Sequence, residues 1–94
     1  MKYGMVAFHY PTPDHRDEFV ARVRAVAEVF RSTPGCLSAE CWLAPDSGAV
    51  VSSVRWESKA AFQTGFAAVQ AADVDVTFDE RESRPREIHR LTSV

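Results

Sequence analysis

The sequence predicts an α+β domain in which one four-stranded antiparallel sheet carries two helices on one face. The chain has 94 residues, which is the length of one domain. Two segments with helical periodicity alternate with three strand-like stretches, and a turn divides the middle stretch into a hairpin. The resulting order, βαββαβ, is that of the ferredoxin-like fold, and we expect residues 1–94 to form this one domain.

Prolines mark the first strand and the first helix. Residues Lys2 to Tyr10 are rich in aromatic and branched side chains, and Pro11 ends the predicted strand. Pro13 suits the first position of a helix, and Thr12 before it is expected to cap the free N–H groups. We expect this helix to run to about Arg31, where a Ser-Thr-Pro-Gly segment follows.

The first predicted helix has one apolar face and one charged face. The apolar residues recur at helical spacing, which predicts that they pack on the sheet. They are Phe19, Val20, Val23, Val26, Ala27 and Phe30. The residues expected to face solvent are Arg16, Arg22, Arg24 and Glu28.

A hairpin, a second helix and a last strand complete the chain. Cys36 to Leu43 and Ala49 to Glu57 are predicted strands joined by a Pro-Asp-Ser-Gly turn. Ser58 is expected to cap a helix from Lys59 to about Gln70. The apolar side of this helix carries Phe62, Phe66 and Val69. Residues 71–82 have no clear pattern, and residues 83–91 read as a strand that begins at a sheet edge, because Pro85 lies near its start.

One face of the predicted sheet has no helix to cover it, yet it carries apolar side chains. Depending on the register, either Trp42 and Cys36 or Leu37, Leu43 and Cys41 point away from the helices. Large apolar groups on such a face favour a partner, so we expect a homodimer that packs sheet against sheet. The alternative is a monomer with scattered apolar surface residues.

Composition and charge exclude several classes of function. The net charge is -2, and the arginines near the C-terminus alternate with acidic residues, so no nucleic-acid partner is expected. No apolar stretch is long enough to span a membrane. Cys36 and Cys41 lie five positions apart in one predicted strand and should point to opposite faces, so we expect two free thiols in a reducing cytoplasm. Glycine-rich phosphate loops and metal-ligand spacings are absent.

Two short segments carry a resemblance to a known family. Pro34-Gly35-Cys36-Leu37, and later Trp56-Glu57-Ser58 followed by Ala61-Phe62, are similar to the signature of the antibiotic biosynthesis monooxygenase domains. The order of the predicted elements extends the likeness over nearly the whole chain. The resemblance implies a dimeric α/β barrel in which each subunit has a pocket between its sheet and its helices. It also implies cofactor-free oxygenation of anthrones or hydroquinones, or haem degradation, as activities of the family.

The resemblance assigns expectations to three residues of this chain. Trp56 corresponds to a tryptophan at the family pocket, where its indole would wall a flat ligand; otherwise it is a core residue. Ser52 stands where anthrone-oxidising members have an asparagine that binds a substrate carbonyl. Phe62 stands where they have a tyrosine, and phenylalanine donates no hydrogen bond. The haem-degrading members need a histidine that residues 59–76 lack.

The residue chemistry suggests His9 as a further candidate. A histidine near the end of the first strand can deprotonate a phenol or enol, although it can also be structural. We therefore expect Trp56, His9 and Ser52 to carry chemistry. The expected apolar substrate contacts are Phe62, Phe66, Val54 and Phe30. His15 is expected at the surface, and His89 faces either solvent or the pocket. No metal or cofactor is expected.

These observations leave three functions open. The first is a cofactor-independent monooxygenase that acts on an electron-rich aromatic, quinol or polyketide-like substrate. The second is a non-catalytic small-molecule-binding or stress-response dimer, holding a small aromatic or apolar ligand. The third is a related reaction on the same scaffold, such as haem degradation, polyketide cyclisation or isomerisation.

Overall fold

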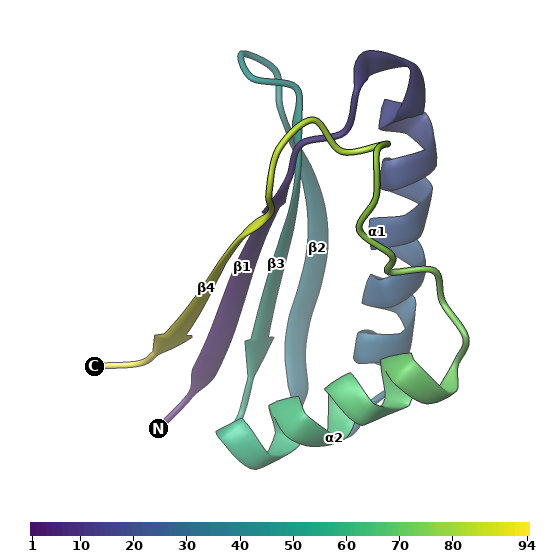
Figure 1. Cartoon of the computed structure of the whole chain (residues 1–94). Helices are drawn as coiled ribbons and strands as arrows, with labels where there is room; N and C mark the ends of the chain where they lie inside the picture. Colours follow the sequence, from purple (N-terminus) through teal and green to yellow (C-terminus); the bar gives the residue numbers. More distant parts are fainter.

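The computed structural model describes all residues 1–94. In chain order the elements are β1 (Tyr3–His9), the short 3-10 helix η1 (Pro13–His15), α1 (Arg16–Arg31), β2 (Cys36–Ala44), β3 (Ala49–Trp56), α2 (Lys59–Ala71) and β4 (Glu87–Thr92). The four strands form one antiparallel sheet in the order β2-β3-β1-β4. Both helices lie on the same side of it (Figure 1). This is the predicted ferredoxin-like α+β fold.

The two helices begin differently. Ser58 caps α2 as predicted, since its side chain accepts a hydrogen bond from the Ala61 N–H at 3.1 Å. Thr12 does not cap a backbone N–H, and this prediction was wrong. Its Oγ1 lies instead 2.8 Å from Nδ1 of His15, because Pro13 starts a tight 3-10 turn before α1 begins at Arg16.

A bulge in β2 changes which face its cysteines occupy. Ala39, Cys41 and Leu43 pair with the helix-facing residues of β3, so Trp42 points to the uncovered face. Between Cys36 and Ser38 the register shifts, and this extra residue returns Cys36 to the helix side, where it packs on the core. The expectation that Cys36 and Cys41 point to opposite faces was therefore wrong, although both thiols are free.

The core lies between the sheet and the helices, in two clusters. The larger one surrounds Trp56, which is fully buried and meets the ring of Phe30 edge to face at 5.2 Å. Gly65 of α2 lies directly on the Trp56 indole. The smaller cluster holds Phe19, Val23 and Val50. The apolar stripe predicted for α1 packs on the sheet, since the buried residues of α1 all belong to it.

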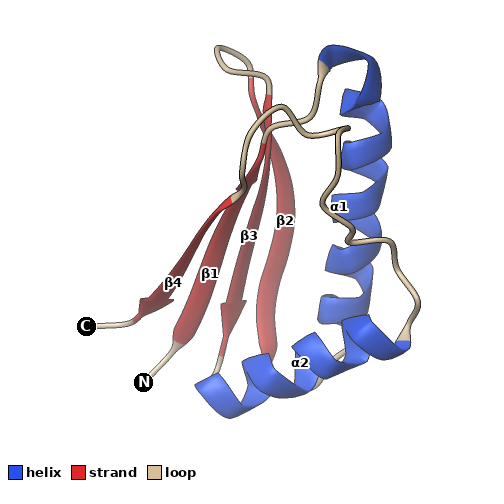
Figure 2. Cartoon of the chain, in the orientation of Figure 1, coloured by secondary structure: helices blue, strands red, loops and turns tan.

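The placement of the helices leaves part of the sheet to be covered by a loop. The helix α1 contacts β2 and β3, whereas α2 crosses one end of the sheet (Figure 2). The predicted last strand begins only at Glu87, so residues 72–86 are a long connection that runs back past α1 (Figure 1). The end of this connection pairs with the chain after β1, through an isolated bridge between Pro11 and Glu82. It thereby covers the end of the helix side of β1, while the residues of β4 stay exposed.

No helix of this chain combines the length and apolar character that crossing a membrane requires.

Candidate functional site

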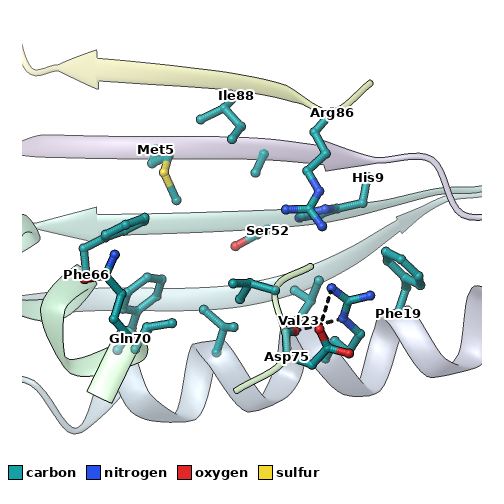
Figure 3. Close-up of a pocket in the computed structure, with 16 residues that line it drawn as sticks. Met5, His9, Phe19, Val23, Ser52, Phe66, Gln70, Asp75, Arg86 and Ile88 are labelled. Atoms are coloured by element: carbon teal, nitrogen blue, oxygen red, sulfur yellow. Dashed lines mark hydrogen bonds and ion pairs between the residues drawn. The ribbon is translucent and has the colours of Figure 1, made fainter. Parts of the chain in front are cut away.

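A cavity of about 210 Å³ lies between the sheet, the two helices and the 72–86 connection. Sixteen residues line it, and ten of them are hydrophobic. Figure 3 shows side chains converging on it from β1, β3, α1, α2 and the start of β4. The lining is therefore apolar with a few polar groups, which is the usual composition of a small-molecule site.

The floor of the cavity follows from strand alternation. Met5 and Ala7 of β1 point to the helix side, and Ser52 of β3 pairs directly with Ala7. Ser52 is buried, its hydroxyl points toward the cavity (Figure 3), and no residue forms a hydrogen bond with it. A ligand in the cavity therefore meets a free hydroxyl on an otherwise apolar floor.

His9 stands at one end of the floor beside an ion pair. Its Nδ1 lies 3.6 Å from Oε1 of Glu82, whose side chain is fully buried. Arg86 forms two bonds to the same carboxylate, with Nε 2.9 Å and Nη2 2.8 Å from Oε2. The Arg86 guanidinium and the His9 ring lie next to each other in Figure 3. Because Arg86 neutralises Glu82, the histidine has a balanced rather than an acidic surrounding.

Burial sets the protonation state of His9. Removal from water lowers the pKa of His9 below 6.5, and the charges of Arg86 and Arg22 lower it further, against an opposing effect of Glu82. The imidazole is therefore neutral at pH 7. A neutral imidazole at a cavity wall is able to accept a proton from a ligand.

Arg22 reaches the cavity from α1, although the sequence placed it on the solvent side. Its side chain is only 11% exposed, and its guanidinium lies 4.3 Å from the centre of the Phe19 ring. Nε and Nη2 donate to the backbone carbonyls of Asp75 and Thr77 at 2.9 and 2.7 Å. The connection thus covers Arg22, and the prediction that Arg22 faces solvent was wrong. Residues 72–86 have no sequence pattern from which this covering position could be predicted.

The structure brings four of the seven predicted site residues together. His9, Ser52, Phe66 and Phe30 all line the cavity. The other three, Trp56, Phe62 and Val54, do not line it.

Those three residues belong to the core. Trp56 is fully buried, with Phe30 and Phe62 packed on its ring, so it supports the cavity wall from behind. Its Nε1 has no hydrogen-bond partner. Phe62 is 6% exposed and packs between Tyr3, Trp56 and Phe66. The expected contact of Trp56 with a ligand does not occur in this geometry, because Gly65 brings α2 down onto the indole.

The two other histidines lie away from the cavity, whereas three charged residues that were not predicted lie at it or beside it. His89 is exposed, and its partner across the sheet, Val6, places it on the uncovered face. His15 is partly exposed beside Asp14. Arg22, Glu82 and Arg86, by contrast, were not predicted at the site. The alternation of acidic and basic residues near the C-terminus was the one available sign of ion pairs, but such a pattern does not show which of these side chains are buried.

A family profile and several solved structures match this chain. The sequence profile of a family described as antibiotic biosynthesis monooxygenase matches residues 2–67. The chain belongs to this family. The matched segment spans β1 to the middle of α2 and so includes His9 and Ser52, whereas Arg86 lies beyond it. A comparison with functionally curated proteins gave no significant match.

Several solved structures share the fold. Rv0793 from Mycobacterium tuberculosis is 23% identical with a TM-score of 0.82, over 100% of this chain and 96% of that one. A conserved protein from Methanosarcina mazei Go1 is 13% identical with a TM-score of 0.82, over 97% and 91% of the two chains. A structure described as an antibiotic biosynthesis monooxygenase is 17% identical with a TM-score of 0.74, over 98% of each chain. At these identities the comparisons establish the fold and leave the activity to the site.

Proposed function

We propose that this family member is a cofactor-independent monooxygenase that oxidises an electron-rich aromatic, quinol or polyketide-like substrate in the 210 Å³ cavity. The observation that carries the proposal is the partly buried, neutral imidazole of His9 at the wall of an apolar cavity, with a free serine hydroxyl on the cavity floor. Such a substrate reduces oxygen itself once it has been deprotonated. The protein must bind it, remove a proton and exclude water.

His9 acts as the base in this proposal. For an anthrone-like substrate, His9 takes a proton from the CH₂ group between the rings, and the carbanion passes one electron to O₂. The resulting radical pair combines to form a C–O bond, and the imidazolium returns the proton to the terminal peroxide oxygen. Loss of water from the C–H and O–OH groups then gives the ketone, so one oxygen atom enters the product and the other leaves as water.

The remaining lining residues bind and orient the substrate. The Ser52 hydroxyl donates a hydrogen bond to the oxygen on which negative charge develops after deprotonation. Phe66, which is 43% exposed, and Phe30 supply aromatic wall on the helix side. Trp56, Phe62 and Val54 act indirectly, because they hold the wall residues in place from the core.

A homodimer is part of the same proposal. Trp42, Val51 and Phe8 form one row across the uncovered face of the sheet, and the Trp42 residue is 57% exposed. Such an exposed apolar row on a sheet face is typical of an interface. A second copy packed face to face would bury it and leave each cavity on the outer, helix side.

Oxygen consumption tests the proposed reaction. Purified protein is given anthrone, 1,4-naphthohydroquinone or a catechol, and uptake is followed with autoxidation subtracted. We expect protein-dependent oxygen uptake. Its rate should fall about 100-fold or more in His9→Gln, which is the usual range for loss of a general base, and the decrease should be smaller in Ser52→Ala. His15→Gln is the matched control, because His15 is a partly exposed histidine that does not line the cavity. Equal rates for His9→Gln and wild type would exclude His9 as the base.

A non-catalytic binding dimer is the second candidate, and one observation favours it. Phe62 has no hydroxyl and is buried in the core, so α2 offers no phenol to the cavity. If the panel compounds bind at the cavity without any protein-dependent uptake, this function replaces the first.

A further inference from the structure

The polar end of the cavity contains Arg22, a positively charged residue with one hydrogen-bond donor group that has no acceptor. Nη1 of Arg22 is buried, and it has no hydrogen-bond partner. The other two nitrogens of the same guanidinium are fixed by the carbonyls of Asp75 and Thr77. The side chain is therefore held in one position with one N–H₂ group free, rather than free to turn toward water.

The neighbouring groups leave this charge only partly balanced. The Asp75 carboxylate lies 3.5 Å from Nη2 of Arg22, but it is half exposed and also faces Arg81. Glu82 bonds to Arg86, and the imidazole of His9 is neutral because burial lowers the pKa of His9. Arg86 itself makes its hydrogen bonds through Nε and Nη2, and its Nη1 makes none. Arg22 and Arg86 thus both line this end of the cavity, and the Nη1 group of each has no hydrogen-bond partner in the protein.

A buried cationic donor without a partner is unfavourable, and an incoming anion removes that cost. Ser52 provides a third free donor on the floor of the same cavity. The rest of the lining is apolar and includes Met5, Val26, Phe66 and Val69. The cavity is therefore divided between one end that favours an oxyanion and a body that favours a ring.

We propose that the cavity binds an aromatic acid, with the carboxylate or ionised hydroxyl of the ligand at Arg22, Arg86 and Ser52 and its ring on the apolar lining. This inference rests on the proposed function for the location of the site, and it narrows the substrate class from electron-rich aromatics in general to those that carry an oxyanion. It also gives Arg22 a binding role besides its contact with the connection.

Binding under anaerobic conditions tests the inference without any turnover. The affinities of 2-naphthoate and 2-naphthamide are measured by titration calorimetry at pH 7, because the two probes have the same ring and size and differ in charge. We expect 2-naphthoate to bind about tenfold more tightly or better, as for a charge-assisted hydrogen bond. Equal affinities of the two probes, or a preference for the amide, would overturn the inference.

Variants locate the charge that causes the preference. Arg22→Gln should remove most of the preference for 2-naphthoate, while Arg24→Gln, an exposed position on the same helix, should leave it unchanged. Because Arg22 also holds the connection, Asp75→Asn is the complementary variant. It removes the carboxylate that competes for Arg22, so 2-naphthoate should bind about two- to threefold more tightly and 2-naphthamide should not change. A gain of this kind cannot arise from unfolding, and its absence would count against the inference.

The outcome is separable from that of the oxygen-uptake experiment. If the protein oxidises neutral hydroquinones but binds the two probes with equal affinity, the oxygenase proposal is retained and the oxyanion site is rejected. A clear preference for 2-naphthoate without any uptake would retain the oxyanion site and reject the oxygenase.

Discussion

Gly65 allows α2 to lie directly on the ring that supports the cavity wall. A methyl group added at Gly65 would come 2.1 Å from Cη2 of Trp56, which is far inside van der Waals contact. Gly65→Ala should therefore destabilise the protein by about 1–3 kcal/mol, although alanine normally favours a helix over glycine. Thermal or urea unfolding measures the change.

A double-mutant cycle identifies the cause. Trp56→Phe removes the outer ring of the indole, so the cost of Gly65→Ala should largely disappear in the double variant. Additive losses would show that the penalty at Gly65 comes from elsewhere.

The pKa of His9 has a consequence for the pH dependence of stability. The folded-state pKa is lower than the unfolded value, so well above pH 6.5 both states are neutral and His9 contributes no pH dependence. As the pH falls below about 6.5, the unfolded chain takes up a proton first, and the free energy of unfolding decreases until the folded-state pKa is passed. His9→Gln should flatten this acid-side decrease in urea unfolding curves. An unchanged slope in His9→Gln would contradict the depressed pKa.

At the scale of elements, the 72–86 connection is held over the cavity by ion pairs with α1. Arg81 bonds to Asp79 within the connection and pairs with Glu18 of α1. The hydrogen bonds from Arg81 lower the pKa of Asp79 to about 2. The Asp79 carboxylate therefore stays ionised, and paired with Arg81, throughout the neutral and mildly acidic range.

Loss of one tether should loosen the connection locally. Glu18→Gln should raise amide hydrogen exchange in residues 75–82 several-fold and change global stability by about 0.5 kcal/mol or less, since the pair is partly exposed. Glu28→Gln is the matched control, because Glu28 pairs only with Arg31 on the exposed side of α1. Equal exchange in both variants would mean that Arg81 and Glu18 do not hold the connection.

Elements in which apolar residues recur with a clear period could be predicted from the sequence, whereas features that depend on long-range contacts could not. The stripe of α1, the hairpin and the Ser58 cap depend on neighbours within a few residues, and the structure confirms them. The shared face of Ser52 and Trp56 follows from strand alternation. The bulge at Cys36 and the late start of β4 depend on pairing with distant strands, so local pattern did not reveal them.

The candidate site was predictable only in part for the same reason. Ser52 lies on a regular strand, so the face that it shares with Trp56 could be inferred. The face to which His9 points depends on the register of β1 against β3, which the sequence alone did not reveal. Trp56 lies in the core because α2 crosses the end of the sheet. The angle between a helix and a sheet cannot be predicted from the periodicity of the helix sequence. Arg22, Glu82 and Arg86 gather only because a patternless connection folds back onto α1 and β1.

At the scale of the whole molecule, the uncovered sheet face predicts self-association. Trp42→Arg should weaken the proposed dimer about thirtyfold or more, as for a buried aromatic anchor at an interface. Leu43→Arg is the matched control, because Leu43 is 55% exposed but lies on the helix side of the same strand. Sedimentation velocity over a concentration series measures both, and a wild type that is monomeric throughout would contradict the sheet-to-sheet dimer.

We propose that oxidation takes place in the cavity between the sheet and the helices, and a substitution that fills this cavity tests the proposed location. Ala7 lies on the floor beside Ser52, and Ala7→Leu adds three carbon atoms that point into the space. Ala25→Leu adds the same atoms at an exposed site on α1. We predict that oxygen uptake with the panel compound oxidised fastest by wild type is lost in Ala7→Leu and retained in Ala25→Leu, with both variants folded by circular dichroism. Uptake by folded Ala7→Leu at the wild-type rate would contradict the account.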